Sequence, residues 1–440
     1  MHKWLLLSVS LSVICYQTYA QDKKATYFKD ITLIDGSGNA AQPHVNLLIN
    51  ADTIVSVISG NHIPPNAKVI DMSGKTVMPL LISGHEHLGL LKGNTSTADN
   101  YTRENVIRQL KRYLHYGVGT VLSLGTDQPL VFALRDSSGK GLIPGATILT
   151  AGYGFGVKGG SPPPAFGQHT LRPETPEQAI SDVDKLAILQ PDFIKIWVDD
   201  GGGSMPKVAQ PVYEAIIKEA HEKGLKVAAH VYFLEDARQL VNAGIDLLAH
   251  SIRDKEVDAA LITAMKEKGV FYIPTLALDE YGFIYAGQPE WINDPFFIRS
   301  LEPGVWDMIT SDVYKKEQQE DKNRGKKMRA FMTAVVNLRK LDSAGVKIAM
   351  GTDAGAFPVR AQGFSEHLEL QLMVEAGLSP LKVISCATLN GATLLGIEKH
   401  TGTLVAGKKA DFMILDGDPS QDINNTRHIV EVWKNGKKAE

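Results

Sequence analysis

The middle of this chain repeats one short pattern, and that pattern limits the folds open to it. From about residue 100 to about residue 380, helix-like segments end at a glycine, and a short apolar run follows at once. The segments 212–223 and 235–243, for example, end at Gly224 and Gly244 and precede the runs 226–231 and 246–250. Glycine often caps a helix C-terminus, and alternating helices and strands are typical of parallel βα units. About seven or eight such units favour a (β/α)8 TIM barrel, an α/β fold, over an open sheet.

The two ends of the chain are instead rich in short, alternating β-like runs. They occur at 27–35, 45–49, 53–58, 69–72 and 75–78, and again at 402–404, 407–416 and 428–433. We expect the two ends to pair into one small β-sandwich domain, and two separate β-appendages are the alternative. The predicted domains are therefore 21–78 and 401–440 for the β-domain and 79–400 for the barrel. Residues from about 280 to 323 break the barrel pattern, and we interpret them as an inserted helical lid.

The first twenty residues have the pattern of a signal peptide. A short polar start precedes the apolar stretch 4–14, and Thr18 and Ala20 place small residues before the expected cleavage point. The sequence thus predicts export, to the periplasm or the medium, after cleavage near Ala20. The apolar stretch is too short to span a bilayer comfortably, and we expect no membrane span elsewhere.

Composition narrows the choice of partners. A chain of 440 residues with 44% hydrophobic content can bury a large core. A net charge of −3 and the lack of a basic stripe argue against a nucleic-acid partner. The mature chain would keep only Cys386, so no intrachain disulfide is expected.

Polar side chains stand at the ends of the expected barrel strands, where barrel enzymes carry their active sites. Two histidines with one residue between them follow the run 78–83, and alternation along a strand directs both to the same side. A lysine lies within the run 193–197, and single polar residues end the runs 227–230, 247–250 and 350–353. In order, these residues are His85, His87, Lys195, His230, His250 and Asp353.

Each of these residues alone has an ordinary explanation. An isolated pair of histidines is a weak motif, Lys195 could pair with Asp199, and Asp353 could cap a helix. Placed together at the strand ends of one barrel, they indicate a metal site. Neutral imidazole and carboxylate are ligands that suit zinc and similar divalent ions.

The set resembles the amidohydrolase superfamily of metal-dependent hydrolases, and within it the prolidase-like and imidazolonepropionase-like branch. The β-domain built from both termini and the run 387–392 with Gly396 are similar as well. The resemblance implies two divalent metals, zinc by default with Mn, Co or Fe as alternatives, and a CO2-derived carbamate on Lys195 that bridges them. One metal would bind His85, His87 and Asp353, and the other would bind His230 and His250. The chain departs from the family at Leu80 and Ser83, where a glycine and an aspartate are usual.

The resemblance implies a hydrolase of amide C–N bonds, dipeptide bonds or others, that uses a metal-activated hydroxide, with Asp353 as the proton acceptor. The leader pattern makes it an exported one. Ester, lactone or organophosphate hydrolysis, and hydrolysis of an imidazolone-type cyclic amide, are alternatives on the same site. A mononuclear deaminase would not need Lys195. A non-enzymatic scaffold would lack ligands, and none of the expected ones is missing.

Two further residues are expected to bind the substrate. Tyr232 follows His230 by two residues and should face the same side. Arg253 lies in the loop after His250, and a guanidinium there could bind a substrate carboxylate through forked hydrogen bonds. The alternative for Arg253 is an ion pair with Asp254 or Glu256. The sequence therefore allows a carboxylate-bearing small molecule as substrate.

Two residues are expected behind the metal ligands. Ser83 precedes His85 by two residues and could orient a ligand through its hydroxyl. His367 stands near the start of the last barrel helix and could support the site or cap that helix. Barrel hydrolases often self-associate, so a homo-oligomer is compatible with the sequence, although no interface can be identified in it.

Overall fold

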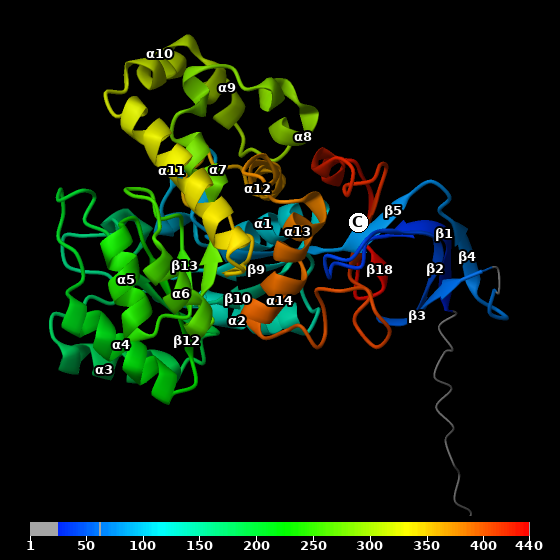
Figure 1. Ribbon diagram of the computed structural model, residues 1–440, viewed down its shortest axis with the longest axis horizontal. Helices are drawn as coiled ribbons and strands as arrows, with labels where there is room; N and C mark the ends of the chain where they lie inside the picture. Colours follow the sequence, from blue (N-terminus) through cyan, green and yellow to red (C-terminus); the bar gives the residue numbers. More distant parts are fainter. Residues whose placement is uncertain (1–24, 61–62, 440) are drawn as a thin grey trace, which may run out of the picture.

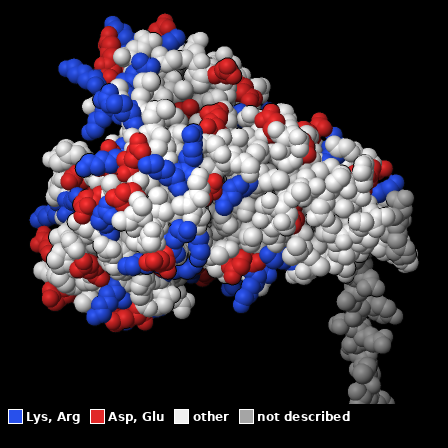
Figure 2. Space-filling view, in the orientation of Figure 1, with Lys and Arg blue, Asp and Glu red and all other residues white. Residues whose placement is uncertain are grey.

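The computed structural model describes residues 25–60 and 63–439, and the structural statements below refer to them. The predicted signal peptide, residues 1–20, lies outside this part of the chain. Among the described residues, no helix combines the length and the apolar character needed to cross a membrane. Figure 2 shows charges of both signs mixed over the helical part of the molecule and fewer charges over the part at the right.

Strands from both ends of the chain form one sheet, drawn at the right of Figure 1. Its order is β18-β17-β16-β5-β1-β2-β3, with β4 paired to β1. The junction is antiparallel pairing of β5 with β16, in which Val77 lies opposite Ile414. The two ends therefore share a sheet, and the facing sheets of a β-sandwich stay a prediction. The strands are β1 (Thr26–Leu33), β2 (Gln42–Asn50), β3 (Thr53–Ser59), β4 (Lys68–Asp71), β5 (Thr76–Pro79), β16 (Phe412–Leu415), β17 (Ile429–Lys434) and β18 (Lys437–Lys438).

The middle of the chain forms parallel strands in two sheets, of order β10-β9-β6 and β11-β12-β13-β14-β15. Single parallel bridges join the sheets at both edges, Phe155 with Ile196 and Glu86 with Ala354. The arrangement is TIM-barrel-like, but only single bridges join the strands at these two edges. The prediction of a continuous barrel is therefore confirmed only in part. The strands are β6 (Leu81–Glu86), β9 (Val118–Ser123), β10 (Thr147–Thr150), β11 (Phe193–Trp197), β12 (Lys226–His230), β13 (Leu247–Ala249), β14 (Phe271–Ile273) and β15 (Lys347–Ile348).

Helices alternate with these strands, and their bounds lie close to the expected ones: α4 spans Gln210–Glu222, where the sequence indicated 212–223. Gly244 and Gly269 cap α5 and α6 in the left-handed conformation, with φ of 97° and 69°. The Thr175 hydroxyl accepts a hydrogen bond at the start of α3. The helices of this part are α1 (Arg103–His115), α2 (Leu130–Gly139), α3 (Pro176–Ala187), α4 (Gln210–Glu222), α5 (Leu234–Ala243), α6 (Ala259–Lys268), α11 (Arg324–Ser343), α12 (Phe364–Glu375), α13 (Pro380–Cys386) and α14 (Leu389–Leu395).

Short helices replace the barrel pattern between β14 and α11, at the top of Figure 1. They are α7 (Leu276–Tyr281), η3 (Ile284–Ala286), η4 (Glu290–Asn293), α8 (Pro295–Ile298), α9 (Val305–Thr310) and α10 (Asp312–Glu320). Buried Glu302 ties this segment to α1, because it accepts hydrogen bonds from Arg108 at 2.7 and 2.9 Å and from Arg112 at 2.8 Å. The segment is thus anchored to the barrel, and its action as a lid stays a prediction. The remaining elements are β7 (Leu91–Lys92), β8 (Thr95–Ser96), η1 (Ala98–Asn100), η2 (Pro164–Phe166) and η5 (Ile423–Arg427).

Candidate active site

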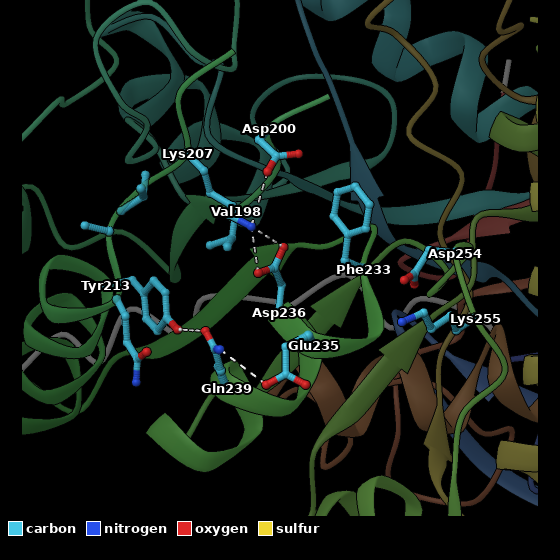
Figure 3. A pocket seen from close by; sticks show the side chains of 13 residues that line it. Val198, Asp200, Lys207, Tyr213, Phe233, Glu235, Asp236, Gln239, Asp254 and Lys255 are labelled. Atoms are coloured by element: carbon cyan, nitrogen blue, oxygen red, sulfur yellow. Dashed lines mark hydrogen bonds and ion pairs between the residues drawn. The ribbon is translucent and has the colours of Figure 1, made fainter. Parts of the chain in front are cut away.

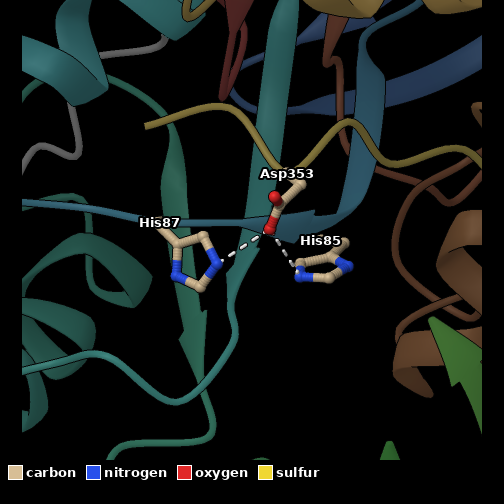
Figure 4. Close-up of side chains that lie close together, drawn as sticks. All are labelled: His85, His87 and Asp353. Atoms are coloured by element: carbon tan, nitrogen blue, oxygen red, sulfur yellow. Dashed lines mark hydrogen bonds and ion pairs between the residues drawn. The ribbon is translucent and has the colours of Figure 1, made fainter. Parts of the chain in front are cut away.

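Two histidines and an aspartate meet at the ends of β6 and β15 (Figure 4). One side-chain ligand atom from each of His85, His87 and Asp353 lies within 4.8 Å of the others, and all three residues are buried. His87 Nε2 is 2.9 Å and His85 Nε2 is 3.2 Å from Asp353 Oδ1. The backbone holds this arrangement, because Asp353 N donates to the His85 carbonyl at 2.9 Å. These three residues could hold one metal ion.

The histidines from β12 and the end of β13 extend this group. The His250 ring centroid lies 4.5 Å from that of His85 and 4.4 Å from that of His230. His85 and His87 are themselves 5.6 Å apart by ring centroid. The four imidazoles predicted from separate strand ends therefore form one continuous cluster.

Lys195 is the predicted residue with the most unusual surroundings. Its side chain is fully buried, and its Nζ has no hydrogen-bond partner among the described residues. Burial lowers the pKa of Lys195 to about 7, and the negative charge of Asp353 opposes this shift only in part. The ion pair with Asp199 that the sequence allowed does not form, because Asp199 Oδ2 instead lies 3.0 Å from His230 Nε2.

Burial also disfavours the charged form of three of the histidines. It lowers the pKa of His85 to about 3, and it is the main cause of the lowered pKa of His230 and of His250. Burial alone would raise the pKa of Asp353, but the guanidinium of Arg360 and the two neighbouring histidines hold it well below the usual range. Neutral imidazoles around an ionised carboxylate are a donor set that suits a divalent cation.

Two threonine hydroxyls orient the imidazoles. Thr126 Oγ1 lies 2.6 Å from His87 Nδ1, and Thr275 Oγ1 lies 3.0 Å from His250 Nδ1. Each contact fixes one ring nitrogen and leaves the other for a ligand. Sequence reasoning missed both threonines, because their loops carry no periodic pattern.

Arg360 is a further site residue that the sequence did not reveal. Its guanidinium bonds Asp353 Oδ2, the carboxylate oxygen that faces away from the histidines. The same guanidinium lies 4.7 Å from the centroid of the Phe357 ring. Arg360 stands in the irregular loop between β15 and α12, so only the three-dimensional structure places it beside Asp353.

The structure corrects the role expected for Ser83. Its hydroxyl donates to Glu86 rather than to a histidine. Glu86 lies between His85 and His87 in sequence, so strand alternation turns it to the opposite side. There it also accepts hydrogen bonds from the Tyr113 hydroxyl and the Thr352 hydroxyl, each at 2.8 Å. Burial, reinforced by nearby Glu366, raises the pKa of Glu86 well above its usual value.

The structure also corrects the role expected for His367. Both of its ring nitrogens have partners outside the histidine cluster, the Thr426 hydroxyl and the Tyr116 carbonyl oxygen, each at 2.9 Å. Its neighbour Glu366 instead joins Glu86, because both carboxylates accept hydrogen bonds from the Thr352 hydroxyl, at 2.9 and 2.8 Å. The prediction chose the wrong residue of this buried helical turn, because sequence alone does not give the rotation of α12.

Tyr232 and Arg253 lie together beside the cluster. The Arg253 guanidinium is 4.9 Å from the Tyr232 ring centroid, and its Nη1 is 2.5 Å from Asp279 Oδ1. Arg253 forms no ion pair with Asp254 or Glu256, the two partners that the sequence offered. Asp254 instead accepts a hydrogen bond from Leu234 N, and Glu256 accepts one from Lys340. Both residues line a cavity of about 410 Å³ together with Asp199, the carboxylate that contacts His230. This volume suits a small molecule.

A second cavity, of about 550 Å³, lies between α4 and α5 and is drawn in Figure 3. Its charged groups bind one another, as Lys207 does with Asp236 at 2.8 Å. Its lining includes none of the predicted site residues. The smaller cavity, which adjoins the histidines, is therefore the candidate substrate site.

Comparisons with known proteins agree with this geometry. The amidohydrolase family model matches residues 76–439. An imidazolonepropionase of Shouchella clausii (strain KSM-K16) is 24% identical over 391 residues, which are 83% of this chain and 70% of that protein. A solved Xaa-Pro dipeptidase with methionine bound in its active site is 26% identical, with a TM-score of 0.75 over 95% of this chain and 100% of its own. The A. niger ochratoxinase structure, 22% identical with a TM-score of 0.72 over 94% of this chain and 95% of its own, shows likeness of fold alone.

Proposed function

The chain belongs to the amidohydrolase family, and we propose that it cleaves amide bonds of small molecules at a binuclear metal site with a carboxylated Lys195. Membership makes the protein a metal-dependent hydrolase of carbon–nitrogen bonds. Beyond family membership, we propose the number of metals, the carbamate on Lys195 and the substrate.

One observation supports the binuclear site above all others. Four imidazoles and Asp353 surround a fully buried lysine whose Nζ has no partner among the described residues. Among the described residues, His85 Nδ1 likewise has no partner, and His85 Nε2 has only the 3.2 Å contact with Asp353 Oδ1. Buried polar atoms without partners are costly, so such a group is expected to be completed by a ligand. A carbamate forms from a neutral amine, and the lowered pKa of Lys195 makes that form accessible near pH 7.

The residues present fit two metals in the arrangement that the family resemblance implies. His85, His87 and Asp353 would hold one metal, His230 and His250 would hold the other, and the carbamate of Lys195 would bridge them. Bound metals would supply Lewis acidity and an activated water at neutral pH. Zinc suits these donors, and Mn, Co or Fe would fit the same groups.

The protein's own residues would supply the proton transfers and the orientation of the substrate. Asp353 would accept a proton from the attacking water and pass it to the leaving amine. Arg360 holds the second carboxylate oxygen of Asp353 and so fixes its direction. Tyr232 and Arg253 would bind a carboxylate of the substrate in the adjoining cavity.

The substrate proposed is a carboxylate-bearing amide, such as an Xaa-Pro dipeptide or an N-acyl amino acid. A Xaa-Pro dipeptidase is among the similar structures, and this supports the proposal. A cyclic amide of the imidazolone type is the second candidate, because imidazolonepropionases are similar over most of the chain. We also propose export after cleavage near Ala20, on the leader pattern alone.

A hydrolysis screen of the zinc-loaded protein tests the proposal. The panel holds Xaa-Pro dipeptides, N-acyl amino acids, cyclic amides and lactones. Release of amino acids from the first two groups is the expected result. Turnover of cyclic amides alone would favour the second candidate, and turnover of lactones alone would contradict the proposed amide substrate.

A further inference from the structure

The cavity beside the histidines contains hydrogen-bond donors that have no acceptor among the described residues. Arg253 is 7% exposed, yet its Nε has no partner among the described residues. The Tyr232 hydroxyl, in the same cavity, forms no hydrogen bond with them either. The buried Arg253 Nε is costly to leave without a partner. Tyr232 is half-buried, and its ring centroid lies 4.9 Å from the same guanidinium. The two donors therefore point to an anionic or carbonyl group of a ligand in this part of the cavity.

Lys326 is a third donor without an acceptor, and it stands at the exposed end of the cavity. It lies on α11, and its ammonium nitrogen stands over Gly202, 3.5 Å from where a Cβ of that residue would be. It has neither a hydrogen bond nor an ion pair with any described residue. The next residue, Lys327, differs in this respect, because its Nζ lies 2.8 Å from Asp321. Lys326 is thus a free cation at the mouth of the cavity.

The carboxylates of the cavity are already engaged. Asp199 contacts His230 and accepts a hydrogen bond from Gly201 N at 2.9 Å. Asp279 bonds Arg253, and only its Oδ2 lacks a partner, which suits an N–H group of a ligand. The positive charge of Lys326 is therefore not cancelled inside the cavity. Figure 2 shows Lys and Arg side chains gathered at the upper left, where α10 and α11 meet in Figure 1.

We infer that Lys326 determines specificity by binding a second carboxylate of the substrate, carried on the side chain of an acidic amino acid. The α-carboxylate of the same amino acid would lie against Tyr232 and Arg253. The inference rests on the proposed function and narrows its substrate class to amides of dicarboxylic amino acids. A cavity of about 410 Å³ has room for a group of this size.

The expected effect is moderate, because Lys326 is exposed and water and salt weaken its attraction for an anion. We expect the zinc-loaded protein to hydrolyse N-acetyl-glutamate about fivefold to tenfold faster, by kcat/KM, than N-acetyl-glutamine at low salt. These two amides differ in charge and hardly in shape. The preference should shrink as ionic strength rises.

The test compares wild type, Lys326→Met and the control Lys322→Met. Lys322 is an exposed lysine four residues earlier that does not line the cavity. Lys326→Met should abolish the preference by lowering kcat/KM for the glutamate amide to that for the glutamine amide, whereas Lys322→Met should behave like wild type. Equal kcat/KM for the two amides in wild type, or a preference that survives in Lys326→Met, would overturn the inference.

Calorimetric binding of the same two amides separates this inference from the proposed function. If neither amide is cleaved, amide hydrolysis of this class is contradicted, and binding still decides the role of Lys326. Tighter binding of the glutamate amide that is lost in Lys326→Met would support the inference. Binding that does not distinguish the two amides would overturn it, even if both are cleaved.

Discussion

The histidine cluster and the cavity beside it are neighbours built in opposite ways. The cluster is buried, and its residues stand at the ends of parallel strands, where backbone pairing such as Asp353 N to His85 O sets their positions. The cavity is lined by loop residues and by residues of α7 and α11. Its hydrogen-bond donors include Tyr232, Arg253 and Lys326, and Arg253 Nε has no hydrogen-bond partner among the described residues. The cluster is therefore suited to a reaction that is the same for every substrate, and the cavity is suited to selecting the substrate.

The two regions should also respond differently to change. A substitution in the cluster removes a ligand from the group that would act on every substrate, so all substrates should suffer alike. A substitution in the cavity removes a contact that only some substrates make, so its effect should depend on the substrate. The following experiments test this division, from the largest expected effect to the smallest.

Lys195→Ala should lower kcat/KM by about a thousandfold or more for every substrate, because the bridging group is lost and the metals supply several kcal/mol of transition-state stabilisation. Steady-state kinetics of the zinc-loaded variant check this, and Lys185→Ala on the surface of α3 is the control. Full activity in a folded Lys195→Ala protein would place the chemistry elsewhere.

Arg253→Met should raise KM for carboxylate-bearing amides by about tenfold to a hundredfold and leave neutral amides nearly unchanged, since a charge-assisted hydrogen bond is lost. Tyr232→Phe is the milder companion, because it removes one hydroxyl and leaves buried Asp279 paired with Arg253. KM values for matched acid and neutral amides provide the measurement. An equal rise for both classes would mean that Arg253 supports the fold rather than the substrate.

Metal loading should become faster as pH rises through about 7. Burial lowers the pKa of Lys195 to about 7, so the neutral amine that can form a carbamate becomes more abundant as pH increases. Metal-free protein given zinc, with bicarbonate adjusted so that dissolved CO2 stays constant, should therefore gain activity about tenfold faster at pH 8 than at pH 6. Omitting bicarbonate is the control, and a rate independent of both pH and bicarbonate would argue against a carbamate.

Glu302→Gln should leave kcat/KM within about twofold of wild type and lower the free energy of unfolding by about 1–3 kcal/mol, because it weakens the charge-assisted hydrogen bonds from Arg108 and Arg112. Denaturant unfolding measures this. Burial alone would raise the pKa of Glu302, but the arginines lower it below 4.5, so the difference from wild type should fade as pH drops below that value. A large loss of activity would show that the inserted segment, from about residue 280 to 323, takes part in catalysis.

The difference between the strand-end cluster and the loop-lined cavity also decides how much of the site the sequence could predict. The six strand-end residues were predictable because strand alternation and the repeated βα unit bring them to one end of the strands. Thr126, Arg360 and Lys326 were not, because their positions depend on loop paths and on the rotation of α11. His367 and Ser83 were misassigned for a related reason. The sequence locates a buried helical turn or strand, but small rotations decide the partner of each side chain. Here Glu86 and Glu366 meet at the Thr352 hydroxyl, on the side of β6 away from the histidines.

The most direct test of the proposed site is a crystal structure of the zinc-loaded protein with anomalous diffraction at the zinc edge. We predict two anomalous peaks about 3.5–4 Å apart, one beside His85, His87 and Asp353 and the other beside His230 and His250, with added density on Lys195 Nζ. A single peak with an unmodified lysine would reduce the site to one metal. No peak among these histidines in a folded, zinc-saturated protein would contradict the account.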